Sequence, residues 1–214
     1  MNKVLLHIET APLPIGELVI KAPVFKAASN LKDAAKITED IEKKKNKYFE
    51  EAAYSENTGR ICAVAFRKYE DNTLTTVLTP YNASERNMIE ILRELFSSEE
   101  VITFRGVRFV YPFIARRSAA YDGLSLFNTD CLYDRNHIGK INPKHTDLAQ
   151  IWACGGLSHP ETLKEITDVL GTAYNFPNQP IHKMLLEEEN KEQVNEYLFE
   201  YLDALEDTAR SILC

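Results

Sequence analysis

A histidine and a glutamate stand two residues apart near the start of the chain, where His7 and Glu9 close the apolar run VLLHIE. Side chains alternate between the two faces of a β-strand, so a strand over this run places both on the same face. Two carboxylates at this spacing can hold a divalent metal ion together. Here an imidazole takes the place of one of them.

The elements that must position this pair follow from the hydrophobic pattern. Apolar and β-branched runs predict strands, and apolar residues at helical spacing predict amphipathic helices. Strands fill the first half and helices close the second, which is typical of a layered α/β or α+β protein. We expect one domain spanning residues 1–214. Strands are expected at 4–9, at 60–81 as a hairpin turning at 70–72, and at 101–106. Helices are expected to begin at residues 33, 84, 112, 147, 160 and 190. Residues 13–30 are expected to be irregular, and 125–144 to form a strand or loop followed by a polar connection.

Three caps are expected at the ends of these helices. Ser84 and Asp147 are placed to cap helix N-termini, and Gly171 to end a helix in the left-handed conformation. The basic run at 43–47 lies inside an expected helix and is flanked by acidic residues. We interpret this run as a solvated helix face.

Composition limits the function classes. The chain has 214 residues, a net charge of −7 and four scattered cysteines. The negative charge argues against tight binding to a phosphate backbone. The cysteine spacing fits reduced thiols, and no stretch approaches the roughly 18–20 apolar residues that span a bilayer. We therefore expect a soluble cytoplasmic protein that does not bind a membrane.

The order of four motifs is similar to that of the DEDD-type (DnaQ-like) 3'-5' exonucleases of the ribonuclease H-like superfamily. The chain most resembles predicted exonucleases related to the proofreading domain of family B DNA polymerases. HIET at 7–10 resembles the family's D-I-E-T, and FRGVRFVYP at 104–112 resembles F-N-G-x-x-F-D-x-P. HTDL at 145–148 keeps H-x-D-L, and VNEYLFEYL at 194–202 resembles the last helical motif. The resemblance implies a ribonuclease H-like fold with a central mixed sheet, flanking helices and a helical C-terminal half.

The resemblance also implies an active site that this sequence lacks in part. The family uses four carboxylates to hold two Mg²⁺ or Mn²⁺ ions, which activate a water molecule. The corresponding residues here are His7, Glu9, Val110 and Tyr201. One carboxylate does not offset the repulsion between two divalent ions, and valine has no lone pair to offer. The expected site is thus degenerate, with Glu9 the only metal ligand retained and no Mg²⁺ or Mn²⁺ bound.

Two arrangements would rescue metal binding. A shift in the last motif would bring Asp203 or Asp207 to the site. A softer ion such as Zn²⁺ would use His7 and Glu9 with Asp147 or another histidine. We predict instead that Arg105 or His7 pairs with Glu9 and fills the former metal volume. His145 and Asp147 are expected to have an architectural role.

Three functions compete. The first is an inactive exonuclease-like protein that binds single-stranded DNA or RNA at its 3' end, or a replication or repair protein. The second is an active exonuclease with rearranged ligands, and the third is a protein-interaction module with no nucleic-acid role. Fold alone does not choose among them. The positions that the resemblance assigns to substrate binding are Thr10, Phe104, Arg105 and Tyr201.

Overall fold

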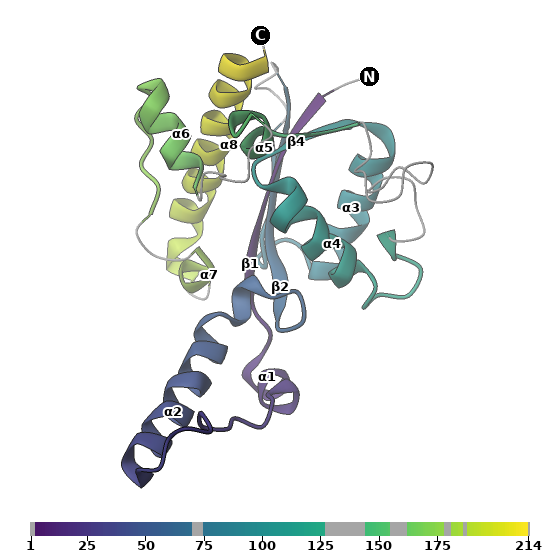
Figure 1. Ribbon diagram of the computed structural model, residues 1–214. Coiled ribbons are helices and arrows are strands. Elements are labelled where there is room, and N and C mark those ends of the chain that lie inside the picture. Colours follow the sequence, from purple (N-terminus) through teal and green to yellow (C-terminus); the bar gives the residue numbers. More distant parts are fainter. Residues whose placement is uncertain are drawn as a thin grey trace.

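A five-stranded mixed sheet forms the centre of the protein (Figure 1). The structure is a computed structural model that describes residues 3–69, 75–126, 144–154, 162–177, 181–185 and 188–213. The strands lie in the order β3-β2-β1-β4-β5, with β1 antiparallel to β2 and parallel to β4. The predicted α/β class with a central mixed sheet is confirmed. The strands are β1 (Lys3–Pro12), β2 (Gly59–Lys68), β3 (Thr75–Leu78), β4 (Glu100–Thr103) and β5 (His145–Asp147).

Helices cover both faces of the sheet because each strand of its centre is apolar on both sides. One face packs against α3 (Glu85–Ser98) and α4 (Tyr111–Ser118). The other packs against α5 (Leu148–Trp152), α6 (Leu163–Leu170), α7 (Ile181–Met184) and the long α8 (Lys191–Leu213). Figure 1 shows these two groups on opposite sides of β1. The predicted helical C-terminal half is therefore confirmed.

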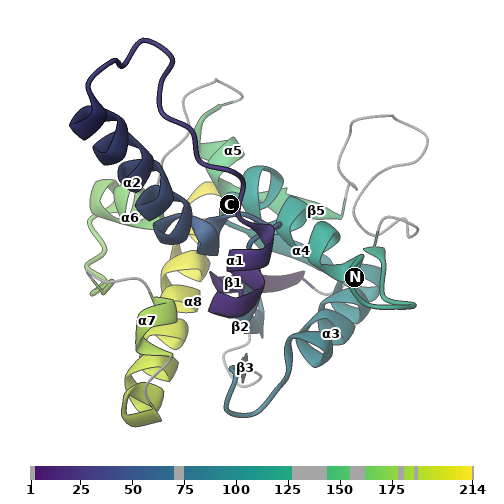
Figure 2. The same cartoon turned by 90° about the horizontal axis from the view of Figure 1, so that it is seen from below.

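An arm built from α1 (Ile15–Lys21) and α2 (Ala34–Glu50) lies beyond the ends of β1 and β2 (Figures 1 and 2). The prediction that 13–30 is irregular is wrong at 15–21. Helix α1 forms there because the Leu18 side chain is buried beside Leu13. The Tyr48 hydroxyl also donates a hydrogen bond to the Leu18 carbonyl oxygen. The 3₁₀ turn η1 (Ala52–Tyr54) leads from α2 back to the sheet. Residues 43–47 of α2 are exposed.

The chain turns sharply after β4. Arg105 has φ 56° and ψ 30°, in the left-handed region, and the π-helix η2 (Gly106–Val110) follows and runs directly into α4. The strand predicted at 101–106 thus ends at Thr103. The helix predicted to begin at Pro112 is α4, which begins one residue earlier, at Tyr111. An Asp147 carboxylate oxygen accepts a hydrogen bond from Val107 N at 2.9 Å, which ties η2 to the start of α5.

The three predicted caps are confirmed. Ser84 accepts a hydrogen bond from Asn87 N, Asp147 accepts one from Ala149 N, and Gly171 ends α6 with φ 75°. The predicted turn at 70–72 and most of 125–144 lie outside the described residues. Among the residues that the structure describes, no helix is long and apolar enough to span a membrane.

Candidate functional site

Glu9 is the centre of the candidate site and has two hydrogen-bond partners. His7 and Glu9 lie on the same face of β1, and their Nε2 and Oε1 atoms are 2.8 Å apart. The hydroxyl of Tyr197, on α8, donates to the same Glu9 oxygen at 2.8 Å. The side chains of His7 and Glu9 are only 13% and 19% exposed. One carboxylate oxygen is thus occupied by two neighbouring side chains.

Tyr201 closes the site from α8. Its ring stacks on that of His7, with centroids 3.6 Å apart and planes at 22°. Tyr197 also meets the imidazole edge to face, and Phe176, from the segment before α7, packs edge to face against both tyrosines. Offset and edge contacts of this kind are favourable for aromatic rings. On the α8 side, Glu9 thus meets the Tyr197 hydroxyl, and His7 meets the ring of Tyr201.

The two tyrosines of the site stay neutral near physiological pH. Burial raises the pKa of Tyr197, and the nearby negative charge of Glu9 raises it further. Burial and Glu9 raise the pKa of Tyr201 in the same way, while the positive charge of Arg105 acts to lower it. Tyr197 therefore keeps its proton as a hydrogen-bond donor to Glu9.

The structure does not bring together all four residues that the resemblance aligns with the family's carboxylates. Tyr201 lies beside His7, but Val110 is buried in the core formed with α3 and α4, on the opposite face of the sheet. Of the predicted substrate-binding positions, Thr10 is buried, and Phe104 is buried in the core beneath α8. Arg105 is half-buried at the left-handed turn.

The carboxylates of the two alternative ligand sets have other partners. Asp203 pairs with Arg67 at 2.5 Å, and Asp207 accepts from the Tyr174 hydroxyl at 2.5 Å. Both oxygens of Asp147 accept backbone hydrogen bonds, one from Val107 and one from Ala149. Within the described ranges, no group of three or more His, Cys, Asp or Glu residues is placed to hold a metal ion.

Sequence reasoning missed Tyr197 as a site residue. Tyr197 and Tyr201 are four residues apart on α8, so they share one helix face. This spacing could have identified Tyr197 from the sequence, because a helix that packs Tyr201 against β1 also places Tyr197 on the side that faces β1. Cys62 is buried on β2, and burial together with the charge of Glu9 raises the pKa of its thiol.

Comparisons with known proteins point to the fold alone. No model of a known protein family matches the sequence, and no curated protein matches it. A similar solved structure is that of the family B DNA polymerase from the hyperthermophilic archaeon Pyrobaculum calidifontis, with a TM-score of 0.59 at 9% sequence identity. The match covers 100% of this chain and 24% of the polymerase chain, so this chain spans about a quarter of the polymerase's length.

Proposed function

We propose that this chain is an exonuclease-like protein that binds nucleic acid without hydrolysing it, at a site where a hydrogen-bonded cluster replaces the metal ions. The observation that carries the proposal is the double hydrogen bond to Glu9 from His7 and Tyr197. The likeness to a family B DNA polymerase and the resemblance to its proofreading domain support a role at a single-stranded 3' end.

Physical chemistry explains why this cluster opposes metal catalysis. A two-metal reaction needs several oxygen ligands around ions about 3.5–4 Å apart. At Glu9, a metal ion would have to displace two hydrogen bonds and the Tyr201 ring stacked on His7. An imidazole and a neutral phenol are poor ligands for Mg²⁺, so the displacement would gain little.

The experiment is digestion of a 3'-end-labelled single strand with Mg²⁺ or Mn²⁺, run beside Glu9→Ala. We expect no release of nucleotides from either protein. Release that depends on Glu9 would overturn the proposal and show that an active ligand set assembles on the substrate. Glu192→Ala, at an exposed position in the first turn of α8, is the matched control for loss of a carboxylate.

Binding is tested by titrating a single-stranded oligonucleotide without metal at several salt concentrations. We expect measurable affinity that falls as salt rises, because phosphate contacts release counterions. Affinity for a 3'-hydroxyl end should exceed that for a 3'-phosphorylated end if the strand terminus reaches the Glu9 site.

A second candidate function, a protein-interaction module with no nucleic-acid role, is favoured by the exposed side of the arm. Ile20 is 84% exposed and Val24 is 83% exposed, which is unusual for large apolar side chains. The net charge of −7 also favours a partner other than nucleic acid. Absence of any salt-dependent oligonucleotide binding would support this function over the first.

A further inference from the structure

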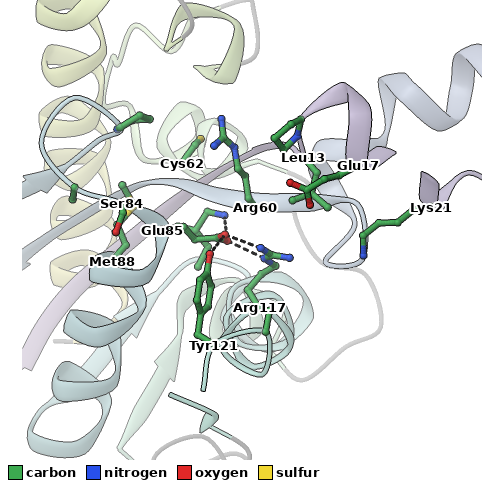
Figure 3. Close-up of a pocket in the computed structure, with 15 residues that line it drawn as sticks. Leu13, Glu17, Lys21, Arg60, Cys62, Ser84, Glu85, Met88, Arg117 and Tyr121 are labelled. Carbon is green, nitrogen blue, oxygen red and sulfur yellow. Dashed lines mark hydrogen bonds and ion pairs between the residues drawn. The ribbon is translucent and has the colours of Figure 1, made fainter. Parts of the chain in front are cut away.

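A cavity of about 590 Å³ lies beside the start of β2, between the N-terminus of α3 and the end of α4 (Figure 3). Leu13 and Lys21 border it from the arm, Arg60 and Ile61 from β2, and Tyr121 from the turn after α4. Its volume is within the range of small-molecule sites in proteins. The cavity lies where β2 begins: Ile61 and Met88 of its wall belong to the core with α3 and α4, and Cys62 belongs to the core beneath α8.

One carboxylate in the cavity wall is fully neutralised by its neighbours. Glu85 accepts hydrogen bonds from Arg117 Nε at 2.9 Å and NH2 at 2.7 Å, from the Tyr121 hydroxyl at 2.7 Å, and from Ile61 N at 2.7 Å. Figure 3 shows the three partners converging on this carboxylate. Burial and the hydrogen bond to Glu85 raise the pKa of Tyr121 to about 12, so its hydroxyl remains a donor. Glu85 therefore has little charge left to repel an anion.

Arg60 provides a positive charge that is not neutralised in this way. Its Nε is buried and has no hydrogen-bond partner among the described residues. Figure 3 shows the Arg60 side chain pointing away from the group around Glu85. A guanidinium offers five N–H donors in a planar fork that suits a carboxylate or a phosphate, and a buried donor without a partner is costly. Lys21 adds a second positive charge, with Glu17 beside it at the exposed rim.

The rest of the wall is largely apolar. Leu13, Pro14, Pro80, Ala83 and Met88 supply carbon surface next to these charges. We propose that the cavity binds a small organic anion, whose carboxylate or phosphate group pairs with Arg60 and Lys21 while its apolar body packs against this surface. Among the described residues that line the cavity, none belongs to the His7, Glu9, Tyr197 and Tyr201 cluster, so the inference goes beyond the proposed function.

Calorimetric titration with phenyl phosphate and with benzoate tests the proposal, with neutral benzyl alcohol as the control ligand. We expect one or both anions to bind and the alcohol not to bind. The tighter of the two anions identifies the preferred group. Arg60→Met should weaken binding about tenfold or more, the effect of losing a charge-assisted hydrogen bond. Lys45→Met removes an exposed lysine of α2 outside the cavity and should leave the affinity unchanged.

Lys21→Met is the second variant, because Lys21 is exposed and its replacement disturbs no buried packing. It should weaken binding by a smaller factor than Arg60→Met. The proposal is overturned if neither anion binds at millimolar concentration, or if both variants bind as the wild type does. It is also overturned if Arg60→Met weakens only oligonucleotide binding, since the cavity would then belong to a nucleic-acid surface. None of these readouts depends on Glu9, so the proposed function stands or falls separately.

Discussion

The imidazole of His7 and the phenol ring of Tyr201 stack with their centroids 3.6 Å apart. Both residues correspond to acids in the exonuclease family that the sequence resembles. The stack joins the first strand of the sheet to its last helix, and Tyr197 adds a hydrogen bond to Glu9 next to it. His7, Tyr201, Tyr197 and Glu9 thus form one packed, hydrogen-bonded unit.

Carboxylates at positions 7 and 201 should create a metal site beside Glu9. In His7→Asp/Tyr201→Asp, three carboxylates would surround the site of the present stack, and we expect Mn²⁺ to raise the melting temperature of this variant but not of the wild type. Without metal the variant should be less stable by about 2–5 kcal/mol, because aromatic packing is lost. His7→Phe/Tyr201→Phe is the control without acids. An equal effect of Mn²⁺ on all three proteins would contradict the prediction.

The buried ion pair between β2 and α8 should contribute strongly to stability. The Arg67 side chain is 4% exposed and contacts Glu206, also 4% exposed, as well as Asp203. Arg67→Met removes this partner while Arg210 still pairs with Glu206 at 2.7 Å, so we expect a loss of about 1.5–3 kcal/mol in the free energy of unfolding, the range for a hydrogen bond to a charged group. Urea denaturation measures it.

Lys164→Met is the matched control for this prediction, since Lys164 pairs with Asp168 on the surface of α6 with both side chains more than half exposed. We expect a change below about 1 kcal/mol. Similar losses in the two variants would show that burial does not set the strength of the Arg67 pair.

Two glycines should respond to alanine in opposite directions. A Cβ at Gly106 would lie 2.1 Å from Thr103 Oγ1 and 2.5 Å from His145 Nε2, so Gly106→Ala should cost about 1–3 kcal/mol or more. A Cβ at Gly16, inside α1, would have no atom within 4 Å. Gly16→Ala should stabilise the protein by up to about 1 kcal/mol, because glycine is a poor helix former. Equal destabilisation in thermal melts would refute this contrast.

His145 should make the protein sensitive to acid. Burial lowers the pKa of its imidazole from 6.5 to about 3, and its Nε2 is hydrogen-bonded to Thr103 Oγ1. Below pH 6.5 the unfolded chain takes up a proton at this residue that the folded chain does not. The contribution of His145 to stability therefore falls by up to about 1.4 kcal/mol per pH unit from pH 6.5 to pH 3, and levels off below pH 3.

The measurement is urea denaturation at several pH values for the wild type and His145→Gln. The variant should lose less stability over this range, and the difference between the two curves isolates His145 from the carboxylates. Parallel curves would mean that His145 titrates alike in both states.

Local sequence patterns predicted the structural features that are determined by residues close together in the chain. The strand carrying His7 and Glu9, the caps at Ser84 and Asp147, and the long last helix follow from short-range periodicity and side-chain hydrogen bonding. Pairing of His7 with Glu9 was also predicted, as one of two possibilities, since both side chains share a face.

Long-range contacts explain what the sequence left undetermined. Helix α1 is short, and Tyr48 donates a hydrogen bond to its Leu18 carbonyl from 30 residues away. The turn at Arg105 is held by the hydrogen bond from Val107 N to Asp147, 40 residues away. The partnership of Tyr197 with Glu9 spans 188 positions. Propensity carries no information about such distant partners.

The position of α8 also has a consequence for synthesis of the protein. The helix supplies the cover for the face of β1 that holds Glu9, and it is made of residues 191–213. Until these residues have left the ribosome, the first strand is present but this side of the sheet remains uncovered. This side of the sheet should therefore be covered only once α8 has emerged, and ribosome-bound chains stalled before residue 191 should be sensitive to protease.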